Sequence, residues 1–354
     1  MHQNLNQMKE NLGLQLSIIV PVYNVEEYIR PCIESIFRQD LDEDTFEVII
    51  VNDGTEDRSM EVIQDIIEQH KNIIILNQEN QGLSIARNNG ITMAKGEYIF
   101  MPDSDDLLIE HSLKPLLEKA IESKADLVVA DFLTMTNEEI HNFGSIQQNK
   151  FIYSEKTGEQ LFLEDLSPYE CFVWRTIYKR DYLIKANLSF YPGIRFQDIP
   201  FTHECYLKAK KCLRVFWILN IYRKWTGAST GTFTLEKAKD FCVAIAKTWE
   251  LTNLNLNNAE EIKLHENIWT SFSVMICNTC HMLQNDSERI ELIDFLRTLI
   301  NDLHFRNGIK QKVISYMYRN MPHVYIRLRY LYGLVFEDIL LPFYNQQLRR
   351  LSIK

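Results

Sequence analysis

Short apolar segments alternate with amphipathic segments over the first 130 residues, and this alternation constrains the fold more than any other feature. The apolar segments occupy 16–20, 46–51, 73–76, 98–101 and 127–130. Each is short and apolar nearly throughout, which is typical of strands buried on both faces. Between them, apolar residues recur at helical spacing, as at Ile29, Cys32, Ile33 and Ile36. We therefore predict an α/β domain built around a mainly parallel sheet with flanking helices.

Polar residues follow the carboxyl ends of these predicted strands. Tyr23, Asp53 and Asn80 come just after three successive strands, and residues 103–106 follow the fourth. Ligands of open α/β sheets bind in the crevice outside the carboxyl ends of the strands. These separate segments are therefore expected to converge on one ligand site.

The densest of these segments is Asp103-Ser104-Asp105-Asp106. Ionised carboxylates so close together repel one another unless a positive charge lies among them. Mg²⁺ commonly binds one or two protein carboxylates together with the oxygens of a substrate phosphate. The alternative is helix capping by Asp and Ser ahead of an apolar helix at Leu107. Convergence with the other loops favours the ligand site over capping alone.

Two common nucleotide-binding fingerprints are absent. Residues 21–26 contain no glycine, so the first strand–helix turn lacks a G-x-G-x-x-G motif, and no G-x-x-x-x-G-K-[ST] loop occurs. A nucleotide at this site would need side chains around its base and a metal at its phosphates.

The charge of the chain is unevenly distributed. The 354 residues carry a net charge of -10, but residues 301–354 hold nine Lys/Arg and three Asp/Glu, which gives +6 there and -16 elsewhere. The acidic body argues against nucleic-acid binding. The basic, aromatic C-terminal tail indicates peripheral membrane contact, a homodimer, or a helix packed on the catalytic domain.

The composition of individual segments also indicates the cellular compartment and the domain boundaries. No apolar run approaches the ~20 residues of a membrane span, and residues 1–15 lack the order of a signal peptide. Seven scattered cysteines indicate reduced, buried thiols in a cytoplasm. We predict an N-terminal extension at 1–15, a catalytic domain at 16–232 whose acceptor part is roughly 133–232, and a mostly helical C-terminal region at 233–354.

Four motifs in order resemble the bacterial family 2 glycosyltransferases, which are inverting enzymes with the GT-A fold. The match is specific over residues 16–132, weaker between 174 and 230, and absent beyond about residue 232. The motifs are Ile18-Ile19-Val20-Pro21-Val22-Tyr23-Asn24, Val51-Asn52-Asp53-Gly54-Thr55-Glu56-Asp57, Asn80-Gln81-Gly82-Leu83-Ser84-Ile85-Ala86-Arg87-Asn88-Asn89-Gly90 and Asp103-Ser104-Asp105-Asp106.

The resemblance implies roles for residues at the donor site. Pro21, Tyr23 and Asp53 would hold the nucleotide base, usually uracil, since a carboxylate accepts the uracil ring N–H. Asp103 would lie toward the ribose, and Asp105 would bind Mn²⁺ or Mg²⁺ on the diphosphate, with Asp103 as a further ligand. The remaining residues assigned to nucleotide or donor binding are Asn80, Arg87, Ser104 and Arg223.

The resemblance also implies a catalytic base and an acceptor surface. Family members place a Glu-Asp pair where this chain has Gln197-Asp198, so Asp198 is the expected base and Glu204 the reserve. Trp174 and Trp225 either form a floor on which an acceptor sugar stacks or belong to the core.

The expected activity is metal-dependent, inverting transfer from a nucleotide sugar, UDP-linked, to a saccharide or lipid-linked acceptor in surface polysaccharide synthesis. Two alternatives remain: a nucleotide-sugar-binding protein with impaired catalysis, and a sugar-phosphate nucleotidyltransferase. The string Cys277-Asn278-Thr279-Cys280-His281 has the form of a c-type haem attachment. Its apolar helical surroundings and the absence of an export signal argue against haem.

Overall fold

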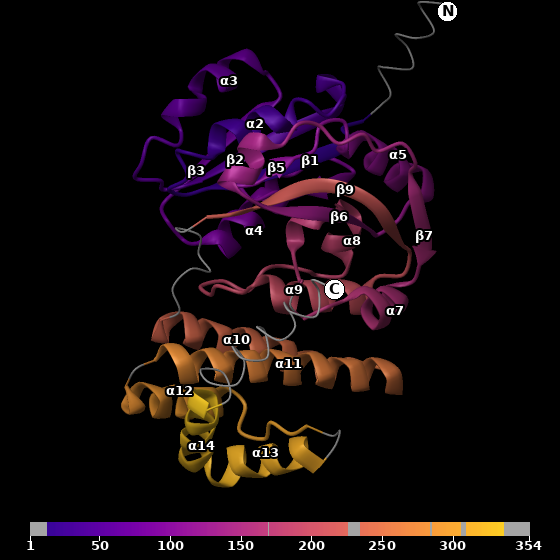
Figure 1. The fold of residues 1–354 in the computed structure, drawn as a ribbon. Coiled ribbons are helices and arrows are strands. Elements are labelled where there is room, and N and C mark those ends of the chain that lie inside the picture. Colours follow the sequence, from indigo (N-terminus) through magenta and orange to yellow (C-terminus); the bar gives the residue numbers. More distant parts are fainter. Residues whose placement is uncertain (1–12, 169, 226–233, 284, 306–308, 336–354) are drawn as a thin grey trace, which may run out of the picture. The chain divides into compact units, whose positions relative to one another are not determined.

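The computed structural model describes residues 13–168, 170–225, 234–283, 285–305 and 309–335 (Figure 1). The chain forms two compact units. Of the described residues, the first unit comprises 13–166, 171–193 and 201–225. The second comprises 167, 168, 170, 194–200, 234–283, 285–305 and 309–335. Each unit is described by itself.

The first unit is built on one mixed sheet. Over the described residues its strand order is β3-β2-β1-β4-β8-β6-β9-β5, and β7 also pairs with β9. The strands are β1 (Leu16–Val22), β2 (Phe46–Asp53), β3 (Ile73–Gln78), β4 (Tyr98–Phe100), β5 (Leu107–Leu108), β6 (Leu127–Thr136), β7 (Ile152–Lys156), β8 (Thr176–Lys179) and β9 (Cys212–Lys224).

The expected α/β fold is confirmed, and its parallel part is the N-terminal half. Strands β1 to β4 pair in parallel, as the continuous apolar runs indicate. Strand β8 then pairs antiparallel with both β4 and β6, while β6 and β9 are parallel. The late strands come from the segment where the sequence pattern loosens, so the sheet is more mixed than its first half suggests.

Helices cover both faces of this sheet (Figure 1). Ile18 and Val20 of β1 share a core with α2, α3 and α5, while Ile19 points to α4 on the other face, where a Cβ at Gly90 would lie 2.3 Å from the Ile19 side chain. Glycine at this position permits the close approach of α4 to β1. The helices of this unit are α2 (Ile29–Ile36), α3 (Gln64–Gln69), α4 (Leu83–Met93), α5 (Leu113–Ser123), α6 (Asn137–Asn142), α7 (Gly158–Gln160) and α8 (Arg180–Lys185), and α9 (Asp198–Lys208) begins in the second unit and continues here.

One local difference concerns the capping alternative for the Asp cluster. The segment after the cluster forms the two-residue strand β5, so no helix begins at Leu107, and helix α5 begins at Leu113. Farther along, β6 ends at Thr136 and helix α6 follows it directly. Thr136 and Glu139 form a reciprocal capping box that starts this helix.

The second unit is helical, as predicted for the C-terminal region. Its described helices are α10 (Leu235–Glu250), α11 (Asn258–Met282), α12 (Asp286–Leu299), α13 (Ile309–Asn320) and α14 (Pro322–Val335). Phe272 of α11, Leu296 of α12 and Ile326 of α14 are fully buried in this unit. Among the described residues, no helix combines the length and the apolar character needed to cross a bilayer.

Some sequence interpretations lie outside these residues. The backbone of Cys277–His281 belongs to α11, but its side chains, and residues 336–354 of the tail, lie outside what is described. The cysteines whose side chains are described are free and buried, as expected.

Candidate active site

The loops after β1 and β2 are joined by hydrogen bonds between their turns. Asn24 adopts a left-handed backbone (φ 51°), and its amide donates to Thr55 Oγ1 at 2.8 Å. The amide of Glu26 donates to Asp57 Oδ2 at 2.9 Å. These bonds fix the turn that follows Tyr23, whose ring is 42% exposed at the carboxyl end of the sheet, while Pro21 before it is buried.

Asp57 is held in its ionised form by these turns. Burial raises the pKa of its carboxyl, but hydrogen bonds from Ser59, Thr55 and the Glu26 amide outweigh burial and leave the pKa below its ordinary value. The carboxylate therefore serves as a structural acceptor between the two loops.

Asp53 connects the end of β2 to the loop before α4. Its Oδ1 accepts from Gln78 Nε2 at 2.7 Å and from the Gln81 amide at 2.8 Å. Its Oδ2 accepts from the Gly82 amide at 2.9 Å. A carboxylate offers about four acceptor positions, and one position on Oδ2 has no partner among the described residues, in a side chain that is 3% exposed.

Asn80 lies in the loop that Asp53 holds. A Cβ at Gly54, whose φ is +68°, would lie 2.8 Å from the Asn80 backbone nitrogen. Glycine is therefore required at this position, both for its backbone conformation and for the close approach of the two loops. The side chain of Asn80 is exposed at this edge.

Arg87 brings a buried positive charge to the same edge from α4. Its side chain is 2% exposed and forms an ion pair with Asp103. The guanidinium carbon lies 5.3 Å from the centre of the Phe190 ring. Its Nε has no hydrogen-bond partner in the part of the chain that the structure describes. Arg87 therefore places a buried positive charge directly beside the Asp cluster.

Residues 103–106 form a tight turn that gathers three carboxylates. The Asp106 amide donates to the Asp103 carbonyl at 3.2 Å. One carboxylate oxygen from each of Asp103, Asp105 and Asp106 lies within 4.8 Å of the others. Ser104 is buried within the same turn.

The electrostatic cost of this cluster appears in its pKa values. Burial raises the pKa of Asp103, and the charge of Asp105 raises it further, against the opposing effect of Arg87. The pKa of Asp106 is raised well above its ordinary value by burial and by the charges of Asp103 and Asp105. Three ionised carboxylates here are therefore unfavourable without additional positive charge.

Residues at and just after the end of β9 donate hydrogen bonds to this cluster. The Arg223 amide donates to Asp106 Oδ1 at 2.8 Å, and its Nε donates to the Asp105 carbonyl at 2.7 Å. Trp225 Nε1 donates to Asp105 Oδ2 at 2.9 Å. Tyr28 supports both side chains: its ring centre lies 4.8 Å from the Arg223 guanidinium carbon and 4.8 Å from the Trp225 ring centre.

This arrangement suits a hard divalent cation. Carboxylate oxygens are the ligands that Mg²⁺ and Mn²⁺ prefer. Asp106 Oδ2 is buried and has no hydrogen-bond partner among the described residues. A positive ion among the three side chains would relieve both the repulsion and the unsatisfied oxygen. Asp103 and Asp105 could bind the ion directly.

Comparison with known proteins agrees with this site. The family model described as "Glycosyl transferase family 2" matches residues 17–185. The glycosyltransferase GlyG of Streptococcus pneumoniae is 32% identical over 248 residues, covering 66% of this chain and 78% of GlyG. The chain belongs to glycosyltransferase family 2. An uncharacterized glycosyltransferase of Bacillus subtilis, EpsJ, is 36% identical over 211 residues, covering 59% of this chain and 61% of EpsJ.

Solved structures show the same fold. The crystal structure of Staphylococcus aureus TarS 1-349 superposes with a TM-score of 0.68 at 20% identity, covering 89% of this chain and 90% of that one. A mannosyltransferase from Pyrobaculum calidifontis superposes with a TM-score of 0.51 at 13% identity, covering 92% and 88%. The family 2 assignment and the GT-A fold expected from the motifs are thus confirmed.

Family membership separates two of the sequence alternatives. A glycosyltransferase is favoured over a nucleotidyltransferase by the family match. Several predicted site residues of the family 2 domain lie together at the carboxyl edge of β1 to β4. They are Tyr23, Asp53, Asn80, Arg87 and the Asp cluster, and Arg223 joins them from β9.

Trp174 lies elsewhere, in an aromatic cluster. It is 3% exposed and stacks on Phe172 and Tyr222, with ring centres at 4.6 and 5.4 Å, and its edge meets Phe132 at 4.9 Å. A ring buried in this way offers no face to a sugar. We therefore treat Trp174 as core and leave it out of the acceptor site.

Asp198 belongs to the second unit, with residues 194–200. It is the first residue of α9 and is partly buried. Pro200 falls in the first turn of this helix, where its missing N–H removes no helical hydrogen bond. The neighbouring Gln197 is 5% exposed. Glu204, the reserve candidate, pairs with Lys208 at 2.6 Å. The role of Asp198 as base stays a prediction.

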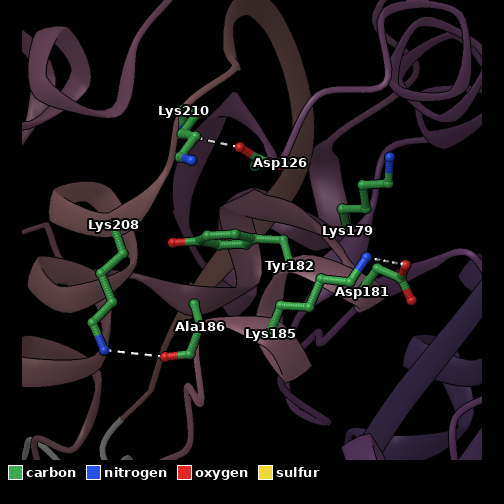
Figure 2. Close-up of a pocket in the computed structure, with 8 residues that line it drawn as sticks. All are labelled: Asp126, Lys179, Asp181, Tyr182, Lys185, Ala186, Lys208 and Lys210. Atoms are coloured by element: carbon green, nitrogen blue, oxygen red, sulfur yellow. Dashed lines mark hydrogen bonds and ion pairs between the residues drawn. The ribbon is translucent and has the colours of Figure 1, made fainter.

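A pocket of about 330 Å³ lies at the opposite edge of the sheet (Figure 2). Lys179, which lines the pocket, lies opposite Tyr98, the first residue of β4, in the sheet register. The Asp cluster instead follows the end of β4. In this pocket Lys185 Nζ bonds Asp181 at 3.0 Å and Lys208 Nζ bonds the Ala186 carbonyl at 3.1 Å. None of its lining residues belongs to the donor site.

Sequence reasoning missed one contact of the site. We expected Trp225 in an acceptor floor or in the core, yet its indole N–H donates to Asp105. The available signal was its position two residues after Arg223 and directly after the end of β9.

Proposed function

We propose that this glycosyltransferase is a metal-dependent, inverting enzyme of the cytoplasm that uses Mn²⁺ or Mg²⁺. It transfers a sugar from a UDP-linked donor to a saccharide or lipid-linked acceptor in surface polysaccharide synthesis. The observation that carries the proposal is the group of three carboxylates within 4.8 Å of one another, at the sheet edge that also holds Asp53 and Arg87.

The nucleotide is recognised by the first two loops. The remaining acceptor position of Asp53 Oδ2 takes the uracil ring N–H, and the exposed ring of Tyr23 lies at the same edge. Arg87 brings its positive charge to the donor through its ion pair with the ribose-facing Asp103. Asp103 and Asp105 would hold the cation, which would supply positive charge to the leaving diphosphate.

The transfer needs a proton acceptor on the sugar-acceptor side. The hydroxyl oxygen of the acceptor attacks the anomeric carbon from the face opposite the diphosphate. Asp198 takes the hydroxyl proton. The bond between the anomeric carbon and the diphosphate oxygen breaks, and its electron pair leaves with the nucleoside diphosphate. Arg223 complements the diphosphate charge late in this step.

Relatives support the choice of donor and pathway. TarS has been solved in complex with UDP-GlcNAc and with UDP. A poly(ribitol-phosphate) beta-glucosyltransferase of Bacillus spizizenii is 26% identical over 201 residues, covering 56% of this chain and 30% of that protein. These proteins motivate a UDP-linked hexose or N-acetylhexosamine and a surface polymer.

The metal assignment is tested by titrating UDP into the protein with and without MnCl₂. We expect UDP binding to depend on Mn²⁺ in the wild type and to be lost in Asp105→Ala. Asp181→Ala, an exposed carboxylate of α8, should bind UDP like the wild type. Equal UDP affinity with and without the metal would remove the cation from the proposal.

The base assignment distinguishes an active enzyme from one with impaired catalysis. Because Asp198 acts only on the acceptor proton, Asp198→Asn should retain UDP binding and lose transfer by at least ~100-fold. Glu204→Gln should retain most activity. A wild type that binds UDP with Mn²⁺ yet neither transfers nor hydrolyses any of a panel of nucleotide sugars would favour the impaired binding protein.

A further inference from the structure

Helices α13 and α14 of the second unit carry two rows of exposed apolar side chains. Within each row the spacing is four and then three residues, which places the row on one helix face. The exposed fraction of these side chains ranges from 43% to 84%. The rows consist of Ile309, Val313 and Tyr316 on α13, and of Val324, Leu328 and Leu331 on α14.

These rows are additional to the faces that hold the helices in the unit. Tyr318 of α13 and Tyr325 and Ile326 of α14 are buried, and Tyr318 donates its hydroxyl to the Ile300 carbonyl at 2.7 Å. Each helix therefore satisfies its packing on one side and still exposes large apolar side chains on another. Exposed apolar side chains grouped in this way are typical of an interaction surface.

The same two helices are strongly basic. Residues 309–335 contain five Lys/Arg and no Asp or Glu, which gives +5 in a chain of net charge -10. Lys310 and Lys312 are exposed, and within the described residues no hydrogen bond or ion pair engages their ammonium groups. Arg327 pairs with Asp286 of α12 at 3.0 Å. The helices that carry the apolar rows thus also carry positive side chains and no negative ones.

The two apolar rows and the adjacent Lys310 and Lys312 are called the α13–α14 face here. We propose that this face is a docking surface for an anionic lipid membrane. Apolar side chains enter the headgroup region while adjacent cations contact anionic headgroups, which is how amphipathic helices bind to bilayer surfaces. A second copy of the chain is the less suitable occupant, because a symmetric contact would place this basic face against itself. The inference does not depend on the transfer reaction.

Co-sedimentation of the full chain with vesicles tests the charge contribution. The protein should bind phosphatidylcholine vesicles that contain phosphatidylglycerol, bind pure phosphatidylcholine weakly, and dissociate as salt rises. Lys310→Glu/Lys312→Glu should weaken binding at least ~10-fold. The control, Lys71→Glu/Lys114→Glu, changes two exposed lysines of the first unit and should leave binding unchanged.

The apolar contribution needs its own variant. Val313→Ser/Leu328→Ser changes side chains that are 51% and 52% exposed, so folding should be preserved while vesicle binding falls. Ile184→Ser, at a 53% exposed position of α8, should bind vesicles like the wild type. Retained circular dichroism and an unchanged thermal transition confirm that the variants are folded.

Three outcomes would overturn the proposal. They are equal binding to neutral and anionic vesicles, equal binding by the wild type and both α13–α14 variants, and a vesicle-independent dimer in sedimentation velocity that Val313→Ser/Leu328→Ser dissociates. The last result would make the face an interface between copies. Asp105→Ala should bind vesicles normally, so a failure of the catalytic proposal is distinguishable from a failure of this one.

Discussion

The two halves of the candidate donor site differ in how far the protein satisfies its own polar groups. In the half built by β1 to β3, Asp53 accepts three hydrogen bonds and Asp57 is held ionised by its neighbours. In the half built by β4 and β9, three carboxylates crowd together and Asp106 keeps an oxygen without a described partner. The first half is therefore preformed, whereas the second leaves a repulsion that the proposed cation would relieve.

Removing the arginine of the second half should have the largest effect on stability. Arg87→Gln leaves the three carboxylates without their buried cation and should lower the free energy of unfolding by about 3 kcal/mol. Saturating MnCl₂ should restore part of this loss. Thermal unfolding with and without the metal measures both effects. Arg58→Gln, at a side chain 72% exposed, should change stability by less than ~0.5 kcal/mol. Equal losses in the two variants would contradict a strained second half.

Removing the charge of Asp53 should disturb the first half without any response to metal. Asp53→Asn replaces one of the two carboxylate oxygens with an NH₂ group. Because each oxygen accepts from a backbone N–H group, one of these N–H groups would then face a donor, and we expect a loss of about 2 kcal/mol. The loss should be the same with and without MnCl₂ in thermal unfolding. Metal rescue of this variant would show that the two halves are coupled.

Trp225 should influence metal affinity through Asp105. Trp225→Phe keeps an aromatic ring beside Tyr28 and removes the donor to Asp105 Oδ2, so Mn²⁺-dependent UDP binding should weaken ~10-fold. The matched control is Trp217→Phe, which removes a hydrogen bond to the Ser112 carbonyl away from the cluster. Titration calorimetry should show unchanged UDP affinity in the control.

The smallest effect concerns Asp57 and pH. Its pKa in the folded protein is below its ordinary value of 3.8, so ionised Asp57 contributes stability above that value. This contribution is lost as pH falls through the lowered pKa. The wild type should therefore exceed Asp57→Asn in melting temperature at neutral pH, and the difference should close under acid conditions. A pH-independent difference would point to geometry rather than charge.

Local sequence patterns predicted the preformed half well. Continuous apolar runs gave the parallel strands, and the polar residues after them converge because carboxyl ends of parallel strands share one edge. Trp174 shows the limit of such patterns. A tryptophan side chain suits a platform for a sugar ring, and only the packing of Trp174 against Phe172 and Tyr222 shows that it is core. The contacts of Arg223 and Trp225 join residues more than 115 positions from the Asp cluster. Such contacts depend on strand register, which a local pattern does not encode.

Register at the end of β9 has a consequence for how such enzymes diversify. Arg223 of β9 and Trp225, directly after the strand, both reach residues 105–106, as residues two positions apart in an extended chain share a side. A slip of β9 by one residue would present Tyr222 and Lys224 to the carboxylates instead. The polypeptide between β6 and β9 can therefore vary in length during evolution, provided that each insertion or deletion leaves this last strand in phase.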